Sequence, residues 1–158
     1  MSLLKEISLV KSSRLAALPV LAAALLLGAC SSPSNPDVSA RQDIMKNYGD
    51  AMGVMGDMMK NPDTFDAAKF QEQAAYLADN ANSPWKHFQD KEAVGHATDK
   101  VWSDADGFRT QAENFQQAAT DLNFVAQNAN GVADVGAEFK EVGASCKSCH
   151  TDYKQKDD

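Results

Sequence analysis

Apolar residues recur at steps of three and four along four separate stretches of the chain, and this spacing constrains the fold more than any other feature. Residues three and four apart lie on one face of an α-helix, so each stretch predicts an amphipathic helix. The clearest stretch carries Phe108, Ala112, Phe115, Ala119, Leu122 and Ala126. It predicts a helix over about 103–128, and the other three predict helices over about 40–60, about 66–82 and about 132–153.

Turn and capping residues separate these stretches. Ser39 and Gln42 match a capping box at the start of the first, and Asn130-Gly131 marks a turn before the last. Residues 82–100 show no helical period, which predicts a long connection with a short turn around Trp85. No segment alternates with the period of two that indicates a strand. We therefore expect an all-α fold, an antiparallel four-helix bundle.

The first predicted helix has an unusual composition. Its methionines are adaptable filler for a core: Met45, Met52, Met55, Met58 and Met59. Gly49, Gly53 and Gly56 interrupt the same helix, and each costs about 1 kcal/mol relative to alanine. A bulky planar ligand packed against the helix would account for these glycines.

The first thirty residues have the pattern of an export signal. Three basic residues, Lys5, Lys11 and Arg14, precede an apolar run that ends in Leu27-Gly28-Ala29-Cys30. The last four residues resemble a bacterial lipobox, which predicts cleavage before Cys30 and lipidation of its thiol. The alternative is an ordinary signal peptide that is cut near Ala29.

These features predict three parts of the chain. Residues 1–29 are a lipoprotein signal peptide, residues 30–37 a flexible lipid-anchored tether rich in Ser and Pro, and residues 38–158 the bundle. The mature protein is thus expected in the periplasm, held at a membrane by its N-terminal lipid alone. Ser31 after the lipid site favours the outer membrane.

The charge of the chain restricts its partners. The formal net charge is -7, and because the first 29 residues carry three basic and one acidic side chain, the remainder has a formal net charge of -9. Such a domain is repelled by nucleic-acid phosphates, so nucleic acid is not an expected partner. The expected partners are redox proteins that present a basic face.

The chemistry of the chain is concentrated near its C-terminus. Cys146, Cys149 and His150 form the pattern C-x-x-C-H, which is typical of covalent c-type haem attachment. One helical turn places both thiols on one face, where they can add to the two vinyl groups of the porphyrin, and the imidazole follows as an iron ligand. A thioredoxin-like redox pair, a structural zinc site and a structural disulfide are the alternatives.

Residues 146–154, Cys-Lys-Ser-Cys-His-Thr-Asp-Tyr-Lys, resemble the motif C-x-x-C-H-x-x-[Tyr/Phe]-[Arg/Lys] of the class II cytochromes c, the cytochrome c′ type. Arg41-Gln42-x-x-Met45 is similar to the Arg-Gln opening of that family. The resemblance covers roughly residues 39–156. It implies a four-helix bundle with one covalent haem c between the helices, His150 as the proximal ligand and the first helix as the distal wall. A homodimer through the first two helices is also implied.

Further residues are predicted to line the haem pocket. Arg41 suits a haem propionate, because a guanidinium pairs with a carboxylate through two hydrogen bonds, and Gln42 lies beside it. Met45 lies one turn after Arg41 and is a sixth iron ligand, an apolar plug over a vacant site or an ordinary core residue. Tyr153 and Lys154 are expected to cover the proximal face. The two other histidines, His87 and His96, are assigned to the surface. Trp102 is assigned to packing.

Two functions follow from these residues, and neither is enzymatic. Electron transfer in the periplasm is the first expectation, since ligation by Met45 would give the iron two protein ligands. The alternative is a five-coordinate, high-spin haem protein that binds NO or CO, if Met45 only shields the iron.

Overall fold

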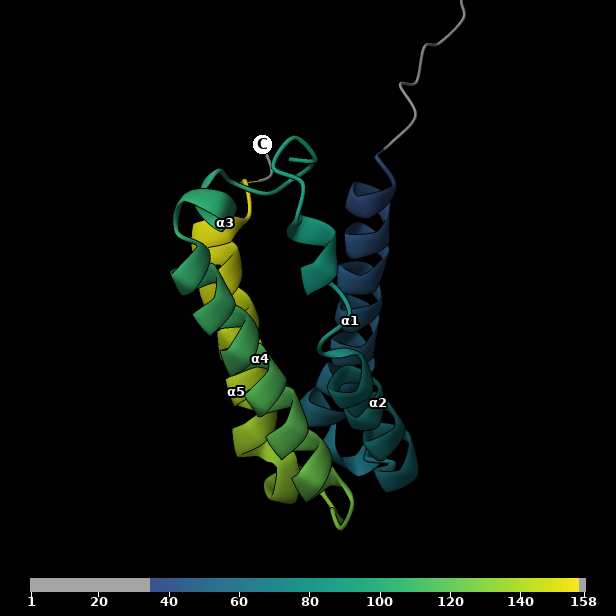
Figure 1. The fold of residues 1–158 in the computed structure, drawn as a ribbon. Helices are drawn as coiled ribbons and strands as arrows, with labels where there is room; N and C mark the ends of the chain where they lie inside the picture. The colour runs from purple at the N-terminus through teal and green to yellow at the C-terminus, as the bar shows by residue number, and fades with distance from the viewer. Residues whose placement is uncertain (1–34, 157–158) are drawn as a thin grey trace, which may run out of the picture. The chain divides into compact units, whose positions relative to one another are not determined.

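The computed structural model describes residues 35–156, which form an all-α bundle (Figure 1). The predictions for the signal peptide, for Cys30 and for most of the tether lie outside these residues. Four long helices, two 3-10 turns and one short helix follow in the order α1 Pro36–Lys60, η1 Pro62–Thr64, α2 Ala67–Asn80, η2 Trp85–Phe88, α3 Lys100–Ser103, α4 Ala105–Ala126 and α5 Val132–Tyr153. Among the described residues, none of the helices has the length and apolar character needed to cross a bilayer.

The four long helices match the predicted bundle. Figure 1 shows α1 beside α2 and α4 beside α5, and α2 packs on α4 to join the two pairs. Helices α1 and α5 contact each other much less than the other neighbouring pairs do.

Helix α1 begins earlier than the sequence predicted. Asn35 caps it, since the side-chain oxygen accepts hydrogen bonds from the backbone N–H of Asp37 at 2.9 Å and of Val38 at 3.4 Å, and Pro36 occupies the first helical position. Ser39 is therefore inside the helix, and the prediction that it caps the helix was wrong. Two residues assigned to the tether, Pro36 and Asp37, are helical.

The third predicted helix is α4, and the short helix α3, which the sequence did not predict, precedes it across a break at Asp104. This residue has φ -124° and ψ 54°, which ends α3, and its carboxylate accepts a hydrogen bond from the backbone N–H of Gly107 at 3.3 Å to cap α4. The last helix has the predicted bounds, and the predicted turn around Trp85 is η2.

The core consists of the periodic apolar residues. The largest fully buried members come from all four long helices: Met55, Phe70, Leu77, Leu122, Val135 and Val142. Met58 is also buried, and Met45, Met52 and Met59 are partly buried against this core. The methionine face of α1 thus fills space between helices, as predicted.

Candidate cofactor site

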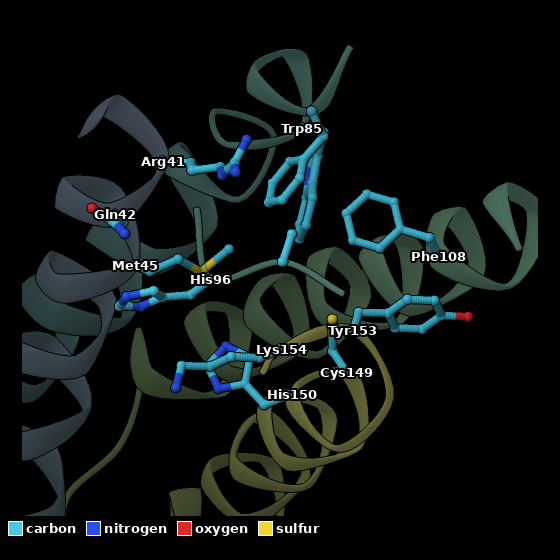
Figure 2. Close-up of a pocket in the computed structure, with 12 residues that line it drawn as sticks. Arg41, Gln42, Met45, Trp85, His96, Phe108, Cys149, His150, Tyr153 and Lys154 are labelled. Atoms are coloured by element: carbon cyan, nitrogen blue, oxygen red, sulfur yellow. The ribbon is translucent and has the colours of Figure 1, made fainter. Parts of the chain in front are cut away.

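Two adjoining cavities lie among α1, η2, α4 and α5. Their volumes are about 230 and about 240 Å³, and both are lined by Met45, Trp85, Cys149 and His150. Figure 2 shows Met45 reaching this space from α1, and Cys149 and His150 reaching it from α5. The structure therefore brings the predicted ligand positions of two helices, distant in sequence, to one site.

Helix α5 contributes the two cysteines and a histidine. Cys146 and Cys149 are separated by one helical turn, both are half-buried, and neither is in a disulfide. His150 is exposed but lines both cavities. The three residues thus share one wall of the site, as the C-x-x-C-H spacing predicted.

The environment of the thiols argues against a redox pair. Burial raises the pKa of Cys146, and burial raises the pKa of Cys149 to about 11. A reactive C-x-x-C pair requires the opposite, a lowered pKa that favours the thiolate. Among residues 35–156, no group of three or more His, Cys, Asp or Glu side chains is placed to hold a metal ion, so the two thiols are not part of a four-ligand zinc site there.

Two glycines on facing helices, α1 and α5, line the second cavity. Gly49 of α1 lines the second cavity, as does Gly143 of α5, and a Cβ added at either position would meet nothing within 4 Å. Neither glycine is therefore required by contacts within the protein. A flat group between α1 and α5 would use the space that two Cβ atoms would otherwise enter.

Aromatic side chains form the remaining walls. Trp85 of η2 lines both cavities and donates a hydrogen bond from Nε1 to the Ala81 carbonyl at 2.7 Å. Its ring contacts those of Phe108 and Phe115 edge-on, with centroids 5.8 and 6.5 Å apart. These walls are apolar and suit a porphyrin. The sequence placed Trp85 in a turn but did not predict that this turn enters the site.

Polar residues also line the first cavity. Arg41, Gln42 and Lys154, which were predicted to line the pocket, do so together with His96. Polar and basic side chains suit the carboxylates of a haem, so the apolar and polar lining together fit the predicted cofactor. His96 was predicted to be a surface residue. It is exposed, but Figure 2 shows its side chain extending into the space between Met45 and Lys154 in this view.

Arg41 has a second set of contacts that the sequence did not predict. Only 4% of the residue is exposed, and the guanidinium donates hydrogen bonds to the backbone carbonyls of His87 at 2.8 Å, Val94 at 2.6 Å and Ala93. Burial lowers the pKa of Arg41, and the nearby carboxylate of Asp37 partly offsets this. The predicted pairing with a propionate is not tested by these contacts.

Tyr153 closes the cavity at the end of α5. It is buried, lines the first cavity, and donates a hydrogen bond from its hydroxyl to Asp104 Oδ2 at 2.7 Å. This hydrogen bond, with burial and nearby acidic groups, raises the pKa of Tyr153 to about 12. The ring therefore serves the cavity wall, while the hydroxyl ties α5 to the start of α4.

Comparisons with known proteins agree with this geometry. A family model described as Cytochrome C' matches residues 37–154. The nitric oxide complex of a mutant of cytochrome c prime from Alcaligenes xylosoxidans is 30% identical, with a TM-score of 0.71, over 77% of this chain and 94% of that chain. Cytochrome c prime from Shewanella frigidimarina is 30% identical, with a TM-score of 0.71, over 76% and 94%.

A carbon monoxide complex of a variant of the Alcaligenes xylosoxidans protein is similar to the same degree. It is 30% identical, with a TM-score of 0.71, over 76% of this chain and 94% of that chain. A search among curated proteins gave no significant match.

Proposed function

Because this chain belongs to the cytochrome c′ family, whose members are non-enzymatic haem proteins with one covalent haem c, we propose that it binds a diatomic gas, NO or CO, in the periplasm. The haem supplies, when bound, an iron at which a diatomic ligand can coordinate. The proposal rests on one observation above all, the open space beside Met45 on the wall supplied by α1.

The residues of α5 would hold the cofactor. Cys146 and Cys149 would each supply a thiol for covalent attachment, and His150 would supply the proximal nitrogen. Both cysteines are half-buried in one wall of the site, and this burial raises the pKa of their free thiols.

The residues of α1 would control the opposite face. Met45 borders both cavities, and one turn later Gly49 leaves room that no side chain of the protein fills. A small ligand needs such room, and it could enter this space without displacing a large side chain. Met45 is therefore proposed as a shield over the iron rather than as a permanent ligand.

Electron transfer, the first expectation from the sequence, has less support than gas binding. Similar proteins have been determined as complexes with nitric oxide and carbon monoxide, at 30% identity over most of their length. The predicted protein partners with a basic face rest on the charge of the chain alone.

The location of the protein is proposed on two grounds. Members of the family are typically periplasmic, which agrees with the export signal in the sequence. The lipid anchor at Cys30 rests on the lipobox resemblance and remains a prediction.

An optical spectrum of the purified holoprotein, oxidised and reduced, before and after adding CO, tests the gas-binding proposal. We expect a high-spin reduced spectrum that shifts when CO is added. Sharp low-spin α and β bands that CO leaves unchanged would contradict the proposal and indicate an electron carrier with a closed iron.

A methionine variant identifies the role of Met45 in the same spectra. With Met45 as a shield, we expect Met45→Ala to leave the spin state unchanged and to accelerate CO binding. Conversion from low spin to high spin would instead identify Met45 as an iron ligand. Met59→Ala is the matched control, because Met59 lies on the same helix, packs against the core and lines neither cavity.

A further inference from the structure

The connection between η2 and α3, residues 89–99, crosses from the start of α1 to the end of α5 (Figure 1). We call this segment the strap. Two of its residues, His96 and Ala97, line the first cavity, so the strap forms part of the cavity wall. What holds the strap in place therefore decides how open this end of the site is.

At its α5 end the strap is held by hydrogen bonds to the residues around the helix terminus. Ala97 and Lys154 form an isolated antiparallel bridge. The Thr98 backbone N–H donates to the Tyr153 carbonyl at 3.0 Å, and the Gln155 backbone N–H donates to the His96 carbonyl at 2.9 Å. This end is tied mainly by backbone groups, which side-chain substitutions do not remove.

At its α1 end the strap is held mainly by one side chain. The guanidinium of Arg41 donates to the carbonyls of Ala93 and Val94 in the strap, and to that of His87 just before it. The same guanidinium lies over the ring of Phe88, with Cζ 4.5 Å from the ring centroid. A hydrogen bond from a charged donor contributes more than a neutral one, so this group of contacts dominates the attachment.

The strap also approaches α1 closely at Gly95. This residue has φ 51°, in the left-handed region that favours glycine. A Cβ there would lie 2.7 Å from Val38 Cγ1 and 3.1 Å from Arg41 Nη2. The sequence thus provides a bare backbone position at the point where the strap meets α1.

We propose that Arg41 is a positioning residue that fastens the strap to α1 and thereby keeps His96 and Ala97 in the cavity wall, where they restrict the access of a small ligand. The part about ligand access rests on the proposed function. The part about the strap does not. A role of Arg41 toward a haem carboxylate alone predicts no effect on the strap, so the two roles are separable.

Hydrogen–deuterium exchange of the holoprotein tests the attachment directly. Two amides report on the residues that Arg41 holds: the Ala93 N–H, which bonds to the Asp90 carbonyl, and the Ala97 N–H, which bonds to the same Val94 carbonyl as Arg41. In Arg41→Lys we expect both to exchange at least about tenfold faster, since a lysine cannot reach three carbonyls with the geometry of a guanidinium. The Thr98 amide, bonded to α5, should change least.

A second variant reaches the same contact from the other side. Gly95→Ala keeps the Arg41 side chain but places a Cβ against both Val38 and the guanidinium, which forces the strap away from α1. It should therefore give the same pattern of faster exchange. Arg109→Lys is the matched control, because Arg109 is exposed on α4 and pairs only with Asp106 and Glu113. It should change neither exchange in the strap nor ligand binding.

The rate of CO binding completes the experiment. We expect Arg41→Lys and Gly95→Ala to bind CO several-fold faster than the wild type and the control. Unchanged exchange in the strap of Arg41→Lys would overturn the proposal, and a shifted reduction potential in that case would assign Arg41 to a haem carboxylate. A wild type that binds no CO would contradict the proposed function, and the exchange data would still decide the role of Arg41.

Discussion

The two cysteines of α5 occupy an environment that is unusual for reactive thiols. Both are half-buried, and burial raises the pKa of each, to about 11 for Cys149. A thiol in such a place is a poor nucleophile toward disulfides and a poor metal ligand, because both roles require the thiolate. Its position on the cavity wall, one turn from its partner, suits a permanent bond to a cofactor instead.

Replacing both thiols should remove the covalent haem. We expect Cys146→Ser with Cys149→Ser to yield protein whose haem is extracted completely by acid acetone and whose mass lacks the haem increment. Ser148→Ala is the matched control, since it changes a residue between the cysteines and leaves the motif C-x-x-C-H intact. Haem retained by the double variant after extraction would contradict attachment at these residues.

Helix α1 contains glycines that lower its stability, and one of them borders a cavity. Gly49 and Gly53 both lie inside the helix, and a Cβ at either would meet nothing within 4 Å. Alanine is favoured over glycine in a helix interior by about 1 kcal/mol. Only Gly49 lines a cavity, so only there does the missing side chain create space for a ligand.

This difference predicts that alanine at the two positions has the same effect on stability but a different effect on CO binding. We expect Gly49→Ala and Gly53→Ala each to raise the free energy of unfolding by up to about 1 kcal/mol, measured by denaturant titration. Gly49→Ala should also slow CO binding, because its methyl group enters the space beside Met45. Gly53→Ala should not. Equal CO binding rates in the two variants would remove Gly49 from the ligand pathway.

The positions of the long helices could be predicted because each buries one periodic stripe of residues. The start of α1 could not, since Ser39 and Gln42 fit a capping box as well as Asn35 fits the observed cap. The short helix α3 was also missed, because the apolar spacing begins only at Phe108, beyond α3. Local capping geometry decides such boundaries, and several nearby residues can satisfy it.

Some residues of the candidate site could be predicted from the sequence and others could not. The C-x-x-C-H motif and Met45 lie on helices. The apolar periodicity of a helix indicates which of its residues share a face. His96 and the contacts of Arg41 depend on the path of the strap, which has no period. Gly95 was the available signal, since a lone glycine in an irregular segment can mark a backbone with positive φ or a close approach.

At the scale of the whole molecule, the bundle consists of two helix pairs joined on one side. Helices α2 and α4 connect the pairs, whereas α1 and α5 have few contacts and are bridged by the strap. A ligand between α1 and α5 would thus contact both pairs. Its contacts would add to the stability of the fold, because apolar surface that is buried between the helices becomes exposed to water on unfolding.

The chain outside the bundle carries the remaining prediction, which concerns where the protein resides. Lipidation at Cys30 should anchor the bundle to a membrane, because several acyl chains on one residue bind a bilayer far more tightly than one does. We expect the wild type in the membrane fraction and Cys30→Ser in the soluble periplasmic fraction, with full haem. Ser32→Ala is the matched control and should remain with the membrane. If Cys30→Ser also stays there, the lipid is not the anchor. If the wild type itself is in the soluble fraction, an ordinary signal peptide cut near Ala29 becomes the better interpretation.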